Sequence, residues 1–119
     1  MSQKIFTLKI EDGTTVEVVR FGNGKPKIFF VSGIHGDEKT GSQTLERLTN
    51  EINSQKIQGT VDIIKIANPK AYQANQRLHP DDKKDLNRNF PSPSNDTPTD
   101  NLAGVLGKFA ISHDLVVDL

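Results

Sequence analysis

The 119-residue chain contains no cysteine and no tryptophan, and only 34% of its residues are hydrophobic. Without cysteine, neither a disulfide nor a cysteine-bound zinc site can form, so side chains can hold a transition metal only through His, Asp or Glu. No apolar run approaches the roughly 20 residues that span a bilayer, and the N-terminus has no apolar signal-peptide core. These absences predict a cytoplasmic protein without a membrane segment.

The chain also lacks an excess of either charge, because 15 Lys and Arg side chains balance 15 Asp and Glu side chains. A net charge of zero gives no electrostatic attraction to nucleic acid or to an anionic membrane, so neither is expected as the main partner. The length fits one domain, and no internal repeat divides the sequence.

The hydrophobic residues gather in short runs, which favours an α/β fold over a helical bundle. Residues 5–10 and 16–19 flank a turn at 11–13, so they predict a β-hairpin. Residues 27–31 form a continuous apolar run, which is typical of a buried strand covered on both faces.

A helix and a second buried strand are expected next. Leu45, Leu48 and Ile52 form one helical stripe, and residues 61–66 are rich in β-branched side chains. Strand, helix and strand in this order predict a parallel unit with a right-handed crossover. Gly41 lies on the same stripe, which predicts close packing of the helix against the sheet.

The last third of the chain begins with a predicted long irregular loop over residues 67–98. Helical spacing returns at 102–109, and residues 115–119 form an apolar strand that resembles the middle of a sheet. An exposed strand of this kind predicts that the chain is truncated after Leu119 and that it self-associates through that strand. The alternative is a terminal strand that belongs to a finished fold.

Candidate metal ligands lie in a glycine-rich corner after the strand at 27–31. His35 and Glu38 are three residues apart at the start of the predicted helix, so they share one helix face and can bind one Zn²⁺. Open α/β sheets bind ligands at such a corner, beyond the carboxyl end of a strand. The alternative is a glutamate that stabilises a helix N-terminus beside an incidental histidine.

A second polar cluster lies in the loop at residues 85–91. Arg88 can hold a carboxylate bidentately, and Asn87 can add one more donor. Asp85 is expected to orient an arginine without contacting the substrate itself. Arg77, ten residues before Asn87, supplies another positive charge on the same loop. The alternative is a solvated loop whose arginines pair with the aspartates of the same loop.

Three segments taken together resemble the signature of the zinc carboxypeptidase superfamily: GIHGDE at 33–38, Asn68-Pro69, and DLNRNFP at 85–91. Within that superfamily, residues 28–119 most resemble the succinylglutamate desuccinylase/aspartoacylase family. The resemblance implies a mixed, largely parallel central sheet flanked by helices, and a mononuclear zinc site. It also implies that residues 1–119 are the N-terminal portion of a single catalytic domain.

The resemblance assigns roles to five residues. His35 and Glu38 match the first two zinc ligands, and Arg77 matches the arginine that polarises the scissile carbonyl. Asn87 and Arg88 match the pair that binds the substrate carboxylate.

The family's third zinc ligand is a histidine after an Asp-Leu pair, whereas this sequence ends at Asp118-Leu119. That ligand and the catalytic glutamate are therefore expected beyond these residues, and Asp118 is expected to orient the missing histidine. His79 and His113 are expected at the surface. With two ligands only, the chain alone is expected to be inactive, because catalytic zinc commonly has three.

The expected function is zinc-dependent hydrolysis of an amide bond in a carboxylate-bearing small molecule, such as an N-acyl amino acid. Two alternatives stay open: a carboxypeptidase or cell-wall peptide amidase of the same superfamily, and a non-catalytic binding or oligomer-forming module.

Overall fold

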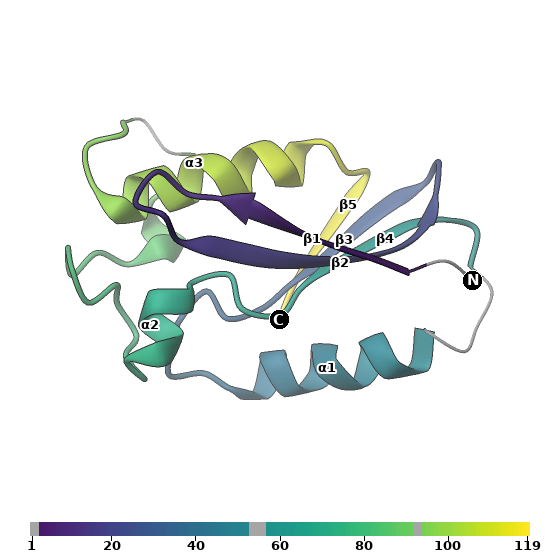
Figure 1. Ribbon diagram of the computed structural model, residues 1–119, viewed down its shortest axis with the longest axis horizontal. Helices are drawn as coiled ribbons and strands as arrows, with labels where there is room; N and C mark the ends of the chain where they lie inside the picture. The colour runs from purple at the N-terminus through teal and green to yellow at the C-terminus, as the bar shows by residue number, and fades with distance from the viewer. Residues whose placement is uncertain (1–2, 53–56, 92–93) are drawn as a thin grey trace.

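The computed structural model describes residues 3–52, 57–91 and 94–119, which form a five-stranded sheet between two layers of helices (Figure 1). The strands are β1 (Gln3–Lys9), β2 (Thr15–Asn23), β3 (Lys27–Val31), β4 (Gly59–Ile64) and β5 (Leu115–Asp118). The helices are α1 (Thr40–Ile52), α2 (Pro69–Gln73), the 3₁₀ turn η1 (Leu86–Arg88) and α3 (Pro98–Ile111). Across the sheet the strands lie in the order β1, β2, β4, β3, β5.

The sheet is mixed, as predicted. β1 and β2 form the expected antiparallel hairpin, and β2 also pairs antiparallel with β4. β4, β3 and β5 run parallel to one another. Since β3 and β4 are neighbours joined through α1, the predicted parallel unit is confirmed.

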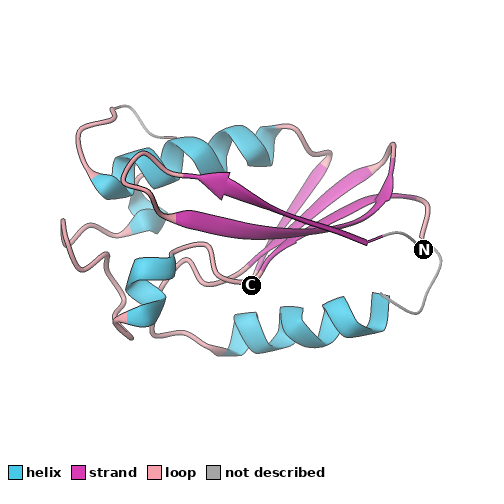
Figure 2. Cartoon of the chain, in the orientation of Figure 1, coloured by secondary structure: helices cyan, strands magenta, loops and turns pink. Residues whose placement is uncertain are grey.

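Each face of the sheet has its own core, and Figure 2 shows helices on both faces. Along β2, Val16 and Val18 face α3, whereas Val19 and Phe21 face α1, because successive side chains in a strand point to opposite faces. Phe29 of β3 is 2% exposed in the α3 core, and its neighbour Phe30 packs against the α1 core on the other face. The expectation that residues 27–31 are covered on both faces is therefore confirmed.

Helix α1 packs closely on the strand ends through Gly41, as predicted. A Cβ atom at Gly41 would lie 2.8 Å from the Leu119 carbonyl oxygen and 3.0 Å from the Cβ of Ser32. Any larger residue would push α1 away from the sheet. Among the described residues, no helix is both long and apolar enough to cross a membrane.

The segment at 67–98 is more ordered than predicted, although its residues 92 and 93 lie outside the described structure. It contains α2 and η1. The amide of Ala71 approaches the side-chain oxygen of Asn68 at the start of α2, and Pro69 occupies the first turn. These are established helix-start signals, but five residues are too few to show a helical period.

Strand β5 lies at the edge of the described sheet, where it pairs with β3. Leu115 and Val116 are 54% and 43% exposed. Residues 115–118 therefore form a strand of the sheet, as predicted, and this strand is the exposed one that the sequence suggested.

The expectation of two surface histidines is wrong. His79 is 3% exposed, and its Nδ1 accepts a hydrogen bond from the amide of Asp81 at 3.1 Å. The His113 side chain is fully buried and packs against the rings of Phe29 and Phe109. The buried partner of His113, Asp62, lies 51 residues away in the sequence, so local sequence could not reveal the pairing.

A buried ionic network joins β2, β4 and the turn before β5. Arg20 lies opposite Asp62 in the sheet and donates to both carboxylate oxygens, at 2.7 and 2.8 Å. His113 Nε2 lies 2.6 Å from the same carboxylate, and His113 Nδ1 lies 2.8 Å from the carbonyl oxygen of Phe109. Burial raises the pKa of Asp62, but the hydrogen bonds and charges of Arg20 and His113 outweigh burial and hold that pKa below 3.8.

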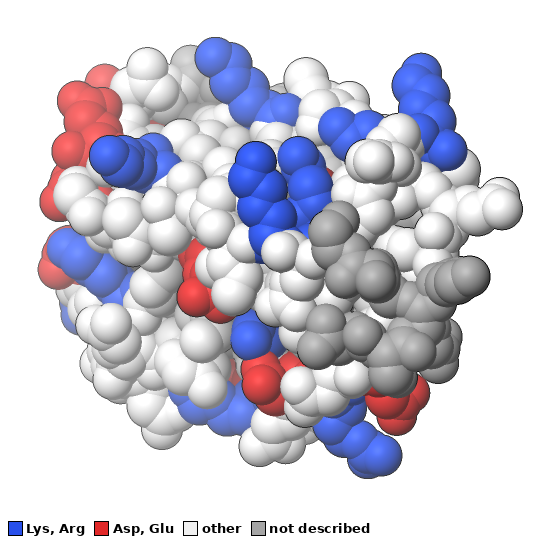
Figure 3. Space-filling model, turned by 45° about the vertical axis from the view of Figure 1, so that its right-hand side comes forward, with Lys and Arg blue, Asp and Glu red and all other residues white. Residues whose placement is uncertain are grey.

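Charges on the surface are of both signs. On the face drawn in Figure 3, basic and acidic side chains are interspersed among uncharged ones. This distribution agrees with the zero net charge of the sequence.

The Asp62→Asn substitution should lower the free energy of unfolding by about 3–5 kcal/mol, because Arg20 and His113 would lose their buried counter-ion. The folded-state pKa of Asp62 is depressed, so its stabilisation is present above pH 3.8 and is lost as the pH falls through that folded-state pKa. Urea denaturation between pH 3 and 7 measures both effects.

Glu17→Gln is the matched control, since Glu17 is an exposed carboxylate on the same strand as Arg20. It should leave the acid dependence unchanged. Identical pH profiles for wild type and Asp62→Asn would show that the network is not the source of acid sensitivity.

Candidate functional site

The carboxyl ends of β4, β3 and β5 meet at one edge of the sheet, beside the C-terminus in Figure 1. In the strand register, Val31 lies opposite Ile64 on one side and Asp118 on the other. Chain segments that follow these strands are therefore brought together, as expected for the ligand-binding edge of an α/β sheet.

The segment after β3 is held by its backbone. The Ser32 amide donates to the Ile64 carbonyl, and the Asn68 amide donates to the Gly33 carbonyl, both at 2.9 Å. Gly33 has φ +74°, and a Cβ there would lie 2.8 Å from the Cα of Ile66. Glycine is therefore required at this position by both conformation and space.

His35 and Glu38 are close, but for a different reason from the one predicted. Helix α1 begins only at Thr40, so both residues lie in a turn before it. The Glu38 amide donates to the His35 carbonyl at 3.3 Å, and His35 Nδ1 lies 3.3 Å from Glu38 Oε2. A four-residue turn brings positions i and i+3 together much as a helix does.

Asp85 fixes the orientation of the His35 ring. Its Oδ1 lies 2.9 Å from His35 Nε2, and both side chains are largely buried, at 17% and 11% exposed. Because an ionised carboxylate only accepts hydrogen bonds, Nε2 carries a hydrogen, so in the neutral ring the lone pair is on Nδ1. Nδ1 faces the Glu38 carboxylate, and in the neutral ring this is the arrangement needed for metal binding by Nδ1.

The charge state of Asp85 follows from its surroundings. Burial raises its pKa, but hydrogen bonds from His35 and the Asn87 amide, together with the charges of His35 and Arg77, lower it overall. The Asn87 amide donates to Asp85 Oδ1 at 3.0 Å at the start of η1. Arg77 Nη2 lies 3.9 Å away, so Asp85 contacts the histidine more closely than the arginine that we expected it to orient.

Arg77 lies beside the candidate ligands. Its Nη1 donates to Glu38 Oε2 at 3.1 Å, and the two side chains are 52% and 63% exposed. The expected alternative, in which the arginine pairs with aspartates of its own loop, holds only for the longer contact with Asp85.

Two hollows meet at this site. One, of about 630 Å³, is lined by residues that include His35, Glu38, Asn87 and Asp118. The other, of about 620 Å³, is largely apolar and lies between α3 and the sheet. Ile34, Asn87 and Asp118 line both, so these three residues stand at the junction.

Asp118 differs from Asp85 in its electrostatics. Burial raises the pKa of Asp118 and the Glu38 charge raises it further, whereas the His35 charge only partly offsets them. Arg88 is exposed on η1 and is not among the described residues that line either hollow. The structure thus gathers every predicted site residue except Arg88.

The metal-ligand set within the described residues is limited. They contain no group of three or more His, Asp or Glu side chains arranged to hold a metal ion. His35 and Glu38 offer two ligands, and Asp85 is committed to the opposite ring nitrogen. Sequence spacing did not reveal the bond between His35 and Asp85, because 50 residues separate them.

Comparison with known proteins gives a consistent result. The succinylglutamate desuccinylase/aspartoacylase catalytic domain matches residues 24–119. The N-alpha-acetyl-L-2,4-diaminobutyric acid deacetylase of Halomonas elongata is 33% identical over 105 residues, which cover 87% of this chain and 30% of that protein.

Solved structures agree with the sequence matches. An aspartoacylase family protein from Mesorhizobium loti superposes with a TM-score of 0.85 at 28% identity, covering 99% of this chain and 39% of the other. A succinylglutamate desuccinylase/aspartoacylase from Rhodobacter sphaeroides gives 0.83 at 26% identity, covering 98% and 39%. The predicted resemblance and the predicted α/β fold are confirmed, and the chain spans 30–39% of the length of these proteins.

The turn that carries His35 depends on Gly36, whose added Cβ would overlap the backbone of Ala71 and Gln76. Gly36→Ala should therefore lower the free energy of unfolding by roughly 1–3 kcal/mol. Gly107→Ala is the control, because a Cβ at this α3 position meets nothing within 4 Å; it should raise stability by about 0.5–1 kcal/mol. Equal effects in urea denaturation would contradict the close packing of Gly36.

Proposed function

Because the chain belongs to the succinylglutamate desuccinylase/aspartoacylase family, a family of amide hydrolases, we propose that it forms the N-terminal portion of a zinc-dependent catalytic domain that removes the acyl group from an N-acyl amino acid. The observation that carries this proposal is the oriented pair of His35 and Glu38, with Asp85 behind the histidine. The Halomonas elongata relative is a deacetylase, which favours a deacylase over a peptidase.

The donor set fits zinc. Imidazole nitrogen and carboxylate oxygen are ligands that Zn²⁺ takes, and a histidine ligand usually donates its other N–H to a carboxylate, as His35 does to Asp85. When bound, zinc supplies a lowered pKa for a coordinated water and polarises the amide carbonyl. We assign the third ligand and the general base to the part of the family's domain that this chain does not cover.

Arg77 is proposed to stabilise the developing oxyanion. Its guanidinium lies 3.1 Å from Glu38 and is half exposed, so it can reach the carbonyl oxygen of a substrate bound beside that glutamate. Negative charge grows on this oxygen as the tetrahedral intermediate forms, and a fixed positive charge lowers the energy of that state.

Asn87 and Arg88 are proposed to bind the substrate carboxylate. Asn87 stands at the junction of the two hollows, and Arg88 follows it on the exposed side of η1. A guanidinium pairs bidentately with a carboxylate, so this pair would select substrates that carry one. Asp118, which also lines both hollows, is proposed to orient the third zinc ligand.

The Asp85→Asn variant should bind Zn²⁺ roughly 10–100-fold more weakly than wild type, because the carboxylate that orients His35 is lost. Competition with a chromophoric chelator at pH 7 measures the affinity. Asp81→Asn is the matched control, since Asp81 is an exposed aspartate that pairs with Lys70. Equal losses in both variants would argue against the assigned role of Asp85.

The Arg88→Ala variant of the full-length protein should raise KM for N-acetyl amino acids while leaving hydrolysis of the corresponding amino-acid amides, which lack the carboxylate, unchanged. Steady-state kinetics on the two substrate series measure this difference. Arg47→Ala, on the exposed face of α1, is the control and should change neither. An unchanged KM for carboxylate substrates in Arg88→Ala would remove Arg88 from the proposed clamp.

A further inference from the structure

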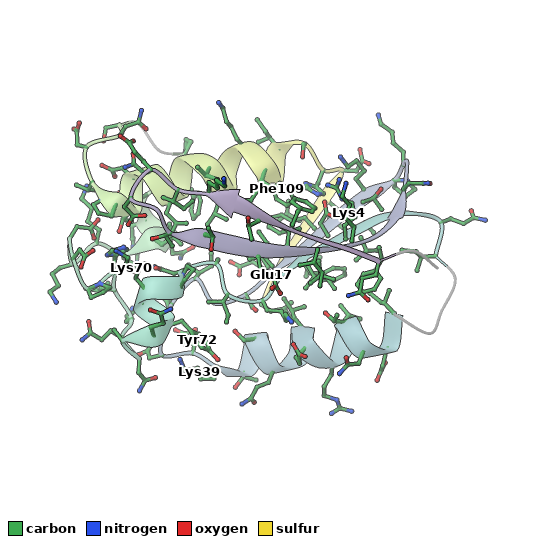
Figure 4. All side chains as sticks on the ribbon, viewed as in Figure 1. Lys4, Glu17, Lys39, Lys70, Tyr72 and Phe109 are labelled. Carbon is green, nitrogen blue, oxygen red and sulfur yellow. The ribbon has the colours of Figure 1, made fainter. Side chains whose placement is uncertain are left out.

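Lys39 ties the turn that carries the candidate ligands to helix α2. Its Nζ donates to the Gly36 carbonyl at 2.6 Å and to the Tyr72 carbonyl at 3.2 Å. The same ammonium lies 3.4 Å from the centre of the Tyr72 ring, and Figure 4 shows the two side chains together below the sheet. A cation over an aromatic face is attracted by the ring electrons, so one ammonium group makes three favourable contacts.

The two segments also pack directly on each other. Gly36 is buried against the backbone of Ala71 and Gln76 with no space for a side chain. The Gln76 amide donates to the Ala71 carbonyl at 3.0 Å, which closes the turn immediately before Arg77. The end of α2 therefore determines where the backbone of Arg77 lies relative to the ligand turn.

The ion pair between Arg77 and Glu38 is a weak alternative means of holding these segments together. Both side chains are more than half exposed, and exposed ion pairs contribute little to stability. Glu38 would also exchange this partner for the metal in the proposed function. The contacts of Lys39 involve backbone carbonyls and a ring, so they remain when Glu38 binds elsewhere.

We propose that Lys39 is a positioning residue: by bridging Gly36 and Tyr72, it fixes Arg77 at the working distance from His35 and Glu38. The bridge itself is a property of the fold, whereas its effect on turnover rests on the proposed function. Lys39 touches neither candidate ligand side chain nor Arg77 in the contacts described above, and so it acts through the backbone.

Four variants separate the parts of the bridge. Lys39→Met removes the ammonium and keeps most of the alkyl chain, whereas Lys39→Arg keeps a cation. Tyr72→Leu removes the ring and keeps the main-chain carbonyl. Lys70→Met is the matched control, because Lys70 lies on α2 and pairs with Asp12 and Asp81 away from the turn.

Amide hydrogen exchange measures how firmly the Lys39 bridge holds the two segments, and it needs neither metal nor substrate. In Lys39→Met, exchange across residues 35–38 and 71–77 should become several-fold faster, with a smaller increase in Tyr72→Leu. Lys39→Arg and Lys70→Met should match wild type. Unchanged exchange in Lys39→Met, or equal increases in Lys70→Met, would overturn the bridge.

Steady-state kinetics of the full-length protein measure the effect of the Lys39 bridge on catalysis. Lys39→Met should lower kcat by up to about 10²-fold with KM little changed, because small displacements of a catalytic group are costly, and Lys39→Arg should restore most of it. Faster exchange with an unchanged kcat would overturn the positioning role. Absence of zinc-dependent hydrolysis in wild type, with exchange responding as expected, would refute the proposed function and support the bridge.

Discussion

The aligned carboxyl ends of β4, β3 and β5 are the constraint on which the rest of the candidate site depends. Val31 lies opposite Ile64 and Asp118 in one register, so the turn after β3, the start of α2 and the end of β5 reach the same place. A one-residue slip would turn every side chain of a strand to the other face. The two cores, which occupy opposite faces of the sheet, make such a slip costly.

The ionic network of Arg20, Asp62 and His113 secures this register away from the site. Asp62 lies opposite both Arg20 and Phe29, and it holds the turn before β5 through His113. A buried carboxylate is costly unless it is fully paired, and here each oxygen has a partner. The network therefore links β2, β4 and the turn before β5 through one carboxylate.

Much of the fold could be predicted because its signals are local. The hairpin, β3, β4 and both long helices show their period within a dozen residues. Burial of His113 and the bond between His35 and Asp85 could not be predicted, since each partner lies about 50 residues away. Roles for Arg77 and Arg88 came from family resemblance, and the described contacts support a place at the site for Arg77 alone.

The spacing of His35 and Glu38 correctly predicted that they lie close together, but it assigned them to a helix when they lie in a turn before α1. This difference has physical consequences. A helix would hold the two side chains through its own hydrogen bonds, whereas here one long bond closes the turn, at 3.3 Å. The turn must therefore be supported from outside. Gly36 packs against the backbone of Ala71 in α2, and Lys39 donates a hydrogen bond to the Tyr72 carbonyl of the same helix. Asp85, in the loop before η1, contacts the His35 ring. Because each support comes from a different part of the chain, the geometry of the ligand pair is a property of the tertiary fold, and two residues at helical spacing do not determine it.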